Sequence, residues 1–314
     1  MYSVQQDNYF KDRKANIEKA IKHTKEMDKR FFAFTKSSSE RADFFRQLPG
    51  DILTKCTGLK CRERPEILMT CKSTTDVVFE NSTNSLYSNI TVLDFADYLK
   101  PGGMFMEGSM AQEESLCHKS NLYNILTYGD QFSEHFADNK EAFQRSKNHA
   151  YSDACVMIPS VIFADDKNRQ KRRTVADVIV LAAPNKRHLD TDNLTESYFD
   201  YVLRKRIEMI FKASYMFYKK RGIITEDEHV SFGKSEAFHL FMFDDNGSNI
   251  KQTLVLGAFG CGVFRNDPHR VAEIMLDCIS RGYANMYDRV IFAIPPGYNH
   301  DAFEDAIDAR IDLD

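Results

Sequence analysis

Near the start of the chain, hydrophobic residues recur with the spacing of an α-helix. Within residues 9–29, five side chains fall on one stripe of a helix: Ile17, Ala20, Ile21, Thr24 and Met27. Ser39 is a suitable N-cap for a second short helix, which Pro49 and Gly50 would stop after Leu48. The pattern predicts that residues 1–70 form an N-terminal helical lobe packed on the rest of the chain.

From about residue 75 the pattern changes to short runs of Val, Ile, Leu and Phe, which are typical of strands buried on both faces. Six runs are expected as strands: TDVVF, NITVLDF, ACVMIPSVIF, ADVIVLAAP, TLVLGAF and DRVIFAI. Helices are expected between the later runs, over 110–127, 196–221, Pro268–Ser280 and Asp301–Ile311. Strands alternating with helices indicate an α/β domain over residues 71–314, with helices on both sides of the sheet.

Composition narrows the classes of protein. A length of 314 residues suits one large α/β domain with an added helical lobe. No apolar stretch approaches the roughly 20 residues of a membrane span, and the first residues lack the apolar core of a signal peptide. The net charge of −4 does not favour polyanions, and the short basic run Lys167–Arg173 is interpreted as a solvated loop. We therefore expect no membrane or sequence-specific nucleic-acid partner.

The cysteines indicate the cellular compartment of the protein and whether it has a metal site. Their number, seven, is odd, and they are scattered, which suggests reduced thiols in a cytoplasmic protein, or a nuclear one if the source is eukaryotic, and not a secreted one. Cys56, Cys61 and Cys71 cluster loosely, but a zinc site would need a fourth ligand and tighter pairs. No metal or cofactor is expected, and the chain is expected to be a monomer.

The first segment that could carry chemistry spans residues 91–123. A predicted strand is followed by a turn with paired glycines, Gly102 and Gly103, which let backbone N–H groups approach a ligand. Gln112 then opens a helix, with Glu113 and Glu114 about 100° apart around its axis. That angle predicts separate roles for the two carboxylates. The alternative is that both simply complement the helix dipole.

The second segment spans residues 253–275. A predicted strand runs into Gly257, Gly260 and Gly262, after which Asp267 and Pro268 suit the start of a helix. A strand, a glycine-rich loop and a helix N-terminus together favour a phosphate, although a purely structural tight turn is the alternative. The spacing matches neither common nucleotide-binding glycine motif, and no phosphate-binding lysine follows. The loop therefore predicts diphosphate binding without phosphoryl transfer.

A third candidate is the end of the run ADVIVLAAPN, where Pro184 and Asn185 follow a predicted buried strand. Ligands of open α/β sheets bind beyond the carboxyl ends of the strands. This position is predicted to be part of a pocket rim.

Together these motifs resemble those of a known family. The sequence PGG, followed seven residues after Met104 by QEESLC and then by LY, resembles the signature of poly(ADP-ribose) glycohydrolases. LGAFGCGVFRNDP resembles the diphosphate loop of the bacterial-type members. The resemblance covers roughly residues 75–300, and it implies a macrodomain-like mixed sheet with an N-terminal helical extension.

The resemblance also implies roles for individual residues. Glu114 would be catalytic, and Glu113 would bind the hydroxyls of the ribose that is released. The other expected ligand-binding residues are Asp94, Gly102, Gly103, Gln112, Gly260, Cys261, Gly262, Val263 and Phe264. Among these, 260–263 would wrap the diphosphate and Phe264 would pack against the ribose distal to adenine. Asp94 lies where eukaryotic members have aspartate and bacterial ones usually asparagine.

The implied function is hydrolysis of ribose–ribose O-glycosidic bonds, which releases ADP-ribose from poly(ADP-ribose) on modified proteins. Glu114 would protonate the leaving oxygen and later accept a proton from water. A helix N-terminus favours an ionised carboxylate, whereas a general acid must hold its proton, so burial or a neighbouring charge has to outweigh the dipole. Met104 stands where the family has a third glycine. This departure leaves two alternatives: a hydrolase of mono-ADP-ribose or another ADP-ribose conjugate, and a non-catalytic ADP-ribose-binding macrodomain.

Overall fold

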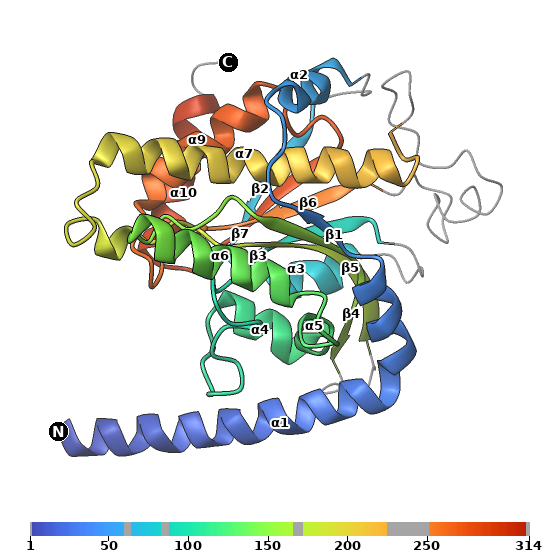
Figure 1. The fold of residues 1–314 in the computed structure, drawn as a ribbon, viewed down its shortest axis with the longest axis vertical. Helices are drawn as coiled ribbons and strands as arrows, with labels where there is room; N and C mark the ends of the chain where they lie inside the picture. The colour runs from blue at the N-terminus through green and yellow to red at the C-terminus, as the bar shows by residue number, and fades with distance from the viewer. Residues whose placement is uncertain (1, 60–63, 83–87, 166–171, 225–250, 312–314) are drawn as a thin grey trace.

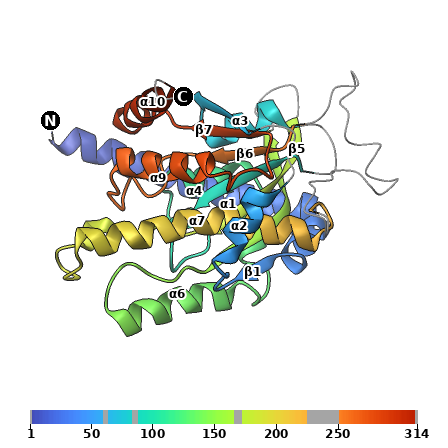
Figure 2. The ribbon, with the colours of Figure 1, turned by 90° about the horizontal axis from the view of Figure 1, so that it is seen from above.

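The computed structural model describes residues 2–59, 64–82, 88–165, 172–224 and 251–311. Seven strands form one mixed sheet in the order β1-β4-β5-β3-β6-β7-β2, with helices on both faces (Figures 1 and 2). The strands are β1 Asp43–Phe45, β2 Glu66–Thr70, β3 Ile90–Phe95, β4 Cys155–Asp165, β5 Arg172–Leu181, β6 Thr253–Leu256 and β7 Arg289–Ala293. The predicted α/β class with a mixed, helix-flanked sheet is confirmed.

The sheet brings five carboxyl ends to one edge. β4 is antiparallel to both of its neighbours, β1 and β5, whereas β5, β3, β6, β7 and β2 run parallel. Parallel strands require crossover connections, and the loops that leave their carboxyl ends gather on the same side. That edge is where open α/β sheets bind ligands.

One face of the sheet is covered by four helices. They are α2 Asp51–Gly58, α7 Glu196–Lys220, α9 Pro268–Ser280 and α10 Tyr298–Ile311, and their apolar side chains share one core with the sheet. The N-terminus of α9 forms as predicted, because the side chain of Asp267 accepts a hydrogen bond from the N–H of His269 at 3.0 Å. Its first residue is Pro268, which needs no N–H partner there.

The opposite face carries α1 Tyr2–Glu40, α3 Thr74–Asn81, α4 Gln112–Lys119 and α5 Leu122–Leu126. The long α1 runs under this layer (Figure 1). On its predicted stripe Ala20 and Met27 are buried, while Ile21 is exposed. A further helix, α6 Ser133–Ser146, was not predicted. It lies beside the β1 edge, where Arg46 pairs with Glu134 and Asp138.

The helix predicted from Ser39 to Leu48 is wrong. α1 continues through a kink at Phe31 to Glu40, and Asp43–Phe45 is the edge strand β1. Ser39 is buried inside α1, and its hydroxyl accepts a hydrogen bond from the side chain of Gln131. A serine hydroxyl bonds wherever a partner is offered, so the same residue type marks both caps and buried contacts.

Two other predictions also need correction. TDVVF is not a strand but most of α3, because Ser73 caps the helix and accepts a hydrogen bond from the N–H of Asp76 at 3.3 Å. Its apolar run is short, and Val77 and Val78 pack on the sheet from a helix. The helix predicted over 110–127 is divided into α4 and α5 at Ser120, which forms a bridge to Phe163 of β4.

The N-terminal segment contributes to the sheet as well as to the helical layer. β1 and β2 both lie within residues 1–70, at the two edges of the sheet. The division at residue 70 stays a prediction. Cys61 and most of the basic run Lys167–Arg173 lie outside the described residues. Within the described ranges, no helix has the length and apolar character needed to cross a membrane.

Candidate active site

A cavity of about 630 Å³ opens at the carboxyl edge of the parallel strands. One side is formed by the loop after β3 and the start of α4, with Gly103, Glu113 and Glu114. The loop after β6 forms the middle, with Gly260 and Phe264 among its lining residues. The structure therefore brings together the two segments that the sequence analysis singled out.

The rest of the cavity wall was missed by the sequence analysis. It is formed by Ser73–Thr75, at the start of α3, and by Pro295–Asn299, which follow β7. The segment after β7 leaves a parallel strand at its carboxyl end, so the rule applied to Asn185 could also have found it. Ser73–Thr75 gave no such signal, because their neighbourhood was read as a strand.

Gln112 fixes the start of α4 against the end of β3. Its Oε1 accepts a hydrogen bond from the N–H of Phe95 at 2.9 Å, and its Nε2 donates to the carbonyl oxygen of Leu93 at 2.9 Å. The side-chain amide thus satisfies two backbone hydrogen-bonding groups near the end of β3. A direct contact of Gln112 with ligand stays a prediction, and the observed bonds favour a positioning role.

The carboxylates of Glu113 and Glu114 converge although they leave the helix in different directions. Only 3% and 6% of these residues is exposed. Glu113 Oε2 accepts a hydrogen bond from the N–H of Asp97 at 2.7 Å, and Glu114 Oε1 accepts one from the N–H of Met104 at 3.0 Å. The angle of about 100° around the helix axis separates the points at which the two side chains leave the helix. Their long side chains overcome it, since both reach Gly103.

Gly103 can only be glycine for this arrangement to exist. A Cβ atom there would lie 2.8 Å from Glu114 Oε1 and 2.9 Å from Glu113 Oε2, and its φ of +57° is left-handed. Gly102 has a φ of +72°, and a Cβ atom there would lie 2.6 Å from the ring of Tyr123. The paired glycines therefore let the loop close over the carboxylates and over the tyrosine of the LY pair.

Asp94 adds a third carboxyl group beneath the glutamates. It is fully buried at the end of β3, and among the described residues neither of its side-chain oxygens has a hydrogen-bond partner. Burial, reinforced by the charge of Glu114, raises the pKa of Asp94 well above its ordinary value. Burial and then the charge of Asp94 likewise raise the pKa of Glu113. Asp94 and Glu113 are therefore both easier to protonate than ordinary carboxyl groups.

The loop after β6 is tightly folded around Gly260. Its φ is +72°, and a Cβ atom there would collide with Asn266 Nδ2 at 2.3 Å and with Ala183 Cβ at 2.6 Å. Asn266 holds the loop from below, since its Nδ2 donates to the carbonyl oxygen of Pro184 at 3.1 Å. Gly262 is different, because a Cβ atom there would meet nothing within 4 Å. The loop thus presents open backbone at Gly262, next to the N-terminus of α9.

Comparison with known proteins identifies the family. The sequence description of the microbial-type PARG catalytic domain, PARG being poly(ADP-ribose) glycohydrolase, matches residues 2–166, which include the paired glycines and both glutamates. This chain belongs to that family. The match begins earlier than the predicted resemblance and ends before the loop after β6. No curated protein sequence matches the chain.

Solved PARG structures share the fold. The enzyme from Thermomonospora curvata is 24% identical, with a TM-score of 0.70, and the match covers 94% of this chain and all of that one. PARG from Deinococcus radiodurans in complex with ADP-ribose is 21% identical, with a TM-score of 0.65 and coverage of 88% and 98%. The Thermomonospora enzyme bound to the inhibitor ADP-HPD is 23% identical, with a TM-score of 0.67 and coverage of 93% and 99%.

Two residues of the loop after β6 in this PARG-family chain have mixed environments. Phe264 lines the cavity and also packs against the core under α7 and α9, so the ligand and core interpretations both apply to it. Cys261 is half-buried beside the carbonyl oxygen of Phe259, and burial raises the pKa of its thiol to about 12. A thiol that keeps its proton at neutral pH is a poor nucleophile, which agrees with its interpretation as a small loop residue.

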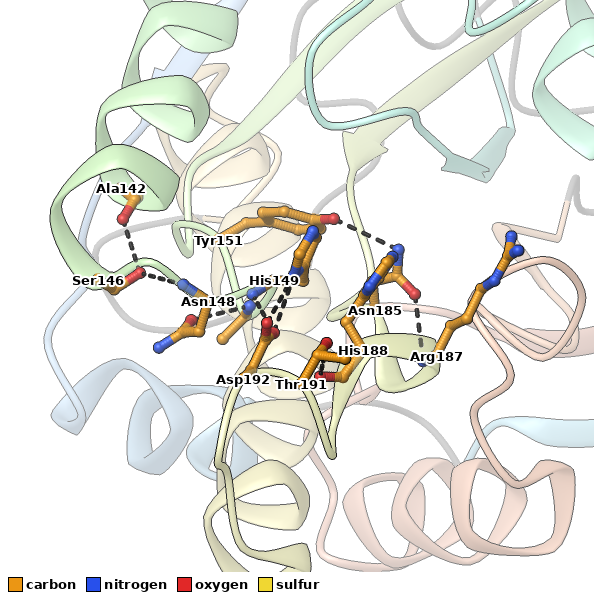
Figure 3. A network of polar contacts seen from close by, with 11 residues as sticks. Ala142, Ser146, Asn148, His149, Tyr151, Asn185, Arg187, His188, Thr191 and Asp192 are labelled. Carbon is orange, nitrogen blue, oxygen red and sulfur yellow. Dashed lines mark hydrogen bonds and ion pairs between the residues drawn. The ribbon is translucent and has the colours of Figure 1, made fainter.

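Asn185, which the sequence analysis placed at a pocket rim, does not line the cavity of this PARG-family chain. Its Oδ1 accepts a hydrogen bond from the N–H of Arg187 at 3.2 Å and caps η1 Lys186–His188, while its Nδ2 donates to the hydroxyl of Tyr151 at 3.4 Å (Figure 3). Of the three loosely clustered cysteines, Cys56 is in the core and Cys71 is exposed, with its Sγ 3.2 Å from His300 Nε2.

Proposed function

We propose that this chain hydrolyses the ribose–ribose O-glycosidic bond of poly(ADP-ribose) and releases ADP-ribose. The observation that carries the proposal is the convergence of Glu113 and Glu114 on Gly103, at one side of a cavity whose middle is a glycine-rich loop at a helix N-terminus. Carboxylates suit glycoside hydrolysis, and the loop suits a diphosphate. Membership of the microbial-type PARG family supports both assignments.

In the proposed mechanism Glu114 acts twice. Its carboxyl group first gives a proton to the oxygen that leaves C1″ of the released ribose, as the C1″–O bond breaks. A water molecule then attacks C1″, and the Glu114 carboxylate accepts one of its protons. The N–H of Met104 occupies Glu114 Oε1, which leaves Oε2 for the substrate. Glu113, held by the N–H of Asp97, would orient the ribose hydroxyls.

Burial of the carboxyl cluster supports this use of Glu114. The N-terminus of α4 favours ionised carboxylates, but burial raises the pKa of Asp94 and the pKa of Glu113 despite it. Three carboxyl groups so close together cannot all be charged at once. The direction of both shifts favours a proton held by Asp94 or Glu113 beside Glu114, and ionised carboxylates would stabilise a positive charge that develops at C1″.

Met104 is the feature that favours a second candidate, a hydrolase of mono-ADP-ribose conjugates. Its backbone keeps the loop geometry, since its N–H bonds Glu114 and its φ is not left-handed. Its side chain is 42% exposed on the cavity wall, where it reduces the space for a leaving group. The Met104 side chain would therefore hinder a bulky polymer unit sterically more than it would hinder a small conjugate.

The test is a side-by-side incubation of the protein with poly(ADP-ribose) chains and with mono-ADP-ribosylated protein. The proposal predicts release of ADP-ribose from the chains at a rate at least ~10-fold above that from the conjugate. Turnover of the conjugate alone would favour the second candidate, and tight ADP-ribose binding without turnover of either would mean a binding module. In this proposal the polymer is attached to ADP-ribosylated proteins. The enzyme acts as a monomer.

A further inference from the structure

The loop after β3 is tied together by its own hydrogen bonds. The N–H groups of Glu107 and Ser109 both donate to the carbonyl oxygen of Met104 at 3.1 Å. Earlier in the loop, the N–H of Gly103 donates to the carbonyl oxygen of Lys100 at 3.0 Å. The two parts are also joined by an ion pair, because Lys100 Nζ lies 3.2 Å from Glu107 Oε1. A displacement of Glu107 is therefore passed on to Met104.

The long helix α1 holds the second part of this loop. Arg13 Nε donates to the carbonyl oxygen of Glu107 at 2.8 Å, and Asn16 Nδ2 donates to that of Gly108 at 3.4 Å. Gly108 has a φ of +82°, and a Cβ atom there would lie only 2.6 Å from the carbonyl oxygen of Arg13. The backbones of helix and loop therefore approach each other as closely as glycine alone permits.

The same loop supports the carboxylate that the proposed mechanism uses. The N–H of Met104 donates to Glu114 Oε1 at 3.0 Å. Two hydrogen bonds connect Arg13 to Met104: one from Arg13 to the carbonyl oxygen of Glu107, and one from the N–H of Glu107 to the carbonyl oxygen of Met104. Arg13 itself does not line the cavity, whereas Met104 and Glu114 do. Any effect of Arg13 on the substrate therefore passes through this loop.

Other contacts anchor α1 to the rest of the molecule. His23 Nε2 lies 2.8 Å from the carbonyl oxygen of Ser120, and the hydroxyl of Ser38 donates to the carbonyl oxygen of Ser160 at 3.2 Å. Apolar side chains of α1 are also buried in the core. The bond from Arg13 is thus one contact among several, and its loss should leave α1 docked on the molecule. What distinguishes Arg13 is that its partner belongs to the loop that carries Met104.

We infer that Arg13 is a positioning residue for glycoside hydrolysis. Through Glu107 it holds the N–H of Met104 against Glu114, so that Glu114 keeps its place beside the glycosidic oxygen. The inference rests on the proposed function. Catalysis depends steeply on such placement, since a shift of about 1 Å can cost roughly 100-fold in rate. Binding of the diphosphate by the loop after β6 does not depend on this contact, because that loop comes from another part of the chain.

The first experiment compares Arg13→Ala with Ser38→Ala, which removes another bond from an α1 side chain to a carbonyl oxygen, at residues that do not line the cavity. Steady-state hydrolysis of poly(ADP-ribose) gives kcat and KM, and calorimetry with ADP-ribose gives the affinity and the number of folded sites. In Arg13→Ala, kcat per folded site should fall at least ~10-fold, with KM and ADP-ribose affinity within about threefold of the wild type. Ser38→Ala should keep the wild-type kcat. Arg13→Lys can still donate to the carbonyl oxygen of Glu107 and should recover part of the lost rate.

A second pair of variants tests the same contact from the side of the loop. Gly108→Ala forces the loop away from α1, whereas a Cβ atom at Gly129, which also has a positive φ, would meet nothing within 4 Å. Gly108→Ala should lose kcat like Arg13→Ala, the double variant should lose little more, and Gly129→Ala should keep the wild-type kcat. An Arg13→Ala enzyme with the kcat of Ser38→Ala, or with an equal loss of ADP-ribose affinity, overturns the inference.

The wild type in the same assay separates this inference from the proposed function. A wild-type protein that releases no ADP-ribose from the polymer overturns the proposed function, and the role of Arg13 with it. A wild-type protein that hydrolyses the polymer, beside an Arg13→Ala variant of equal kcat, overturns the role of Arg13 alone.

Discussion

At the scale of single residues, the site depends on one position where no side chain is tolerated. Both glutamate carboxylates lie against Gly103, so the loop after β3 and the carboxyl cluster are built around the missing Cβ atom. Asp94 completes the cluster from below, buried and without a hydrogen-bond partner among the described residues. These contacts make Gly103 a sharper probe of the site than its conformation alone would.

Gly103→Ala is therefore expected to lose at least ~100-fold in polymer turnover. Gly129→Ala is the matched control, because Gly129 has a φ of +61° and a Cβ atom there would meet nothing within 4 Å. Both variants should lose roughly 1–2 kcal/mol of unfolding free energy from the left-handed backbone. Turnover and denaturant titrations check this, and equal turnover in the two variants would mean that the carboxylates do not depend on Gly103.

The sequence predicted which residues would come together in the site, but not the hydrogen bonds that hold them there. Gly102, Gly103, Glu113 and Glu114 were picked out by spacing and by resemblance. The bond from Asp97 to Glu113 could not be, because it depends on how a backbone N–H is turned after the strand ends. The two hydrogen bonds between the side-chain amide of Gln112 and β3 likewise depend on tertiary folding.

At the scale of elements, the loop after β6 is the second half of the site. Its ends are fixed by β6 and by the capped N-terminus of α9, and its middle is pinned where Gly260 meets Asn266. Gly262, by contrast, faces open space. A side chain there would stay clear of the protein and enter the volume in which a diphosphate is expected.

Gly262→Val is accordingly expected to weaken ADP-ribose binding at least ~10-fold while the melting temperature stays within a few degrees. Gly50→Val, at the start of α2, is the control, since a Cβ atom there is equally free and its φ is −68°. Calorimetry with ADP-ribose and thermal denaturation give the two readouts. An unchanged affinity in Gly262→Val would remove the phosphate assignment from this loop.

Elements were predictable where local signals agreed. For α9 an N-cap, a first-position proline and an amphipathic pattern pointed to the same helix, and its bounds are as expected. For α3 the short apolar run indicated a strand, whereas Ser73 is the N-cap of a helix. The segment forms the helix. β1 has only three residues and exists through pairing with β4, so no local pattern could indicate it.

At the scale of the whole molecule, an acidic group lies within the sheet itself. Asp177 of β5 accepts a hydrogen bond from the N–H of Ser160, at an irregularity of β4, at 2.9 Å. Burial, only partly offset by that bond and by Arg221 and Arg41, raises the pKa of Asp177 from 3.8 to about 7. The folded state therefore keeps a proton that the unfolded state loses above about pH 4.

This raised pKa predicts how stability depends on pH. Between about pH 4 and 7 the folded state binds more protons at Asp177 than the unfolded state, so the contribution of this residue to stability falls as pH rises. Asp177→Asn cannot ionise, and its Oδ1 can still accept from Ser160. It should be more stable than the wild type at pH 8, by on the order of 2–4 kcal/mol, with the gap closing towards pH 4.

Denaturant titrations at pH 4, 6 and 8 measure this gap. Asp305→Asn, at an exposed position of α10, is the control and should follow the wild type at every pH. A constant gap between Asp177→Asn and the wild type across this range would show that Asp177 does not titrate there. The sequence did not indicate this group, because its burial follows from the position of β5 between β4 and β3.

The claim that matters most for the whole molecule is that it breaks a glycosidic bond with Glu114. The most direct measurement is the rate of poly(ADP-ribose) hydrolysis by Glu114→Gln, beside the wild type and beside Glu304→Gln at an exposed position of α10. Glutamine keeps the shape of Glu114 and can still accept the N–H of Met104, but it has no proton to give. The rate should fall at least ~100-fold, with ADP-ribose still bound within a few-fold, while Glu304→Gln stays at the wild-type rate. Polymer degradation by Glu114→Gln at a near wild-type rate would contradict the account.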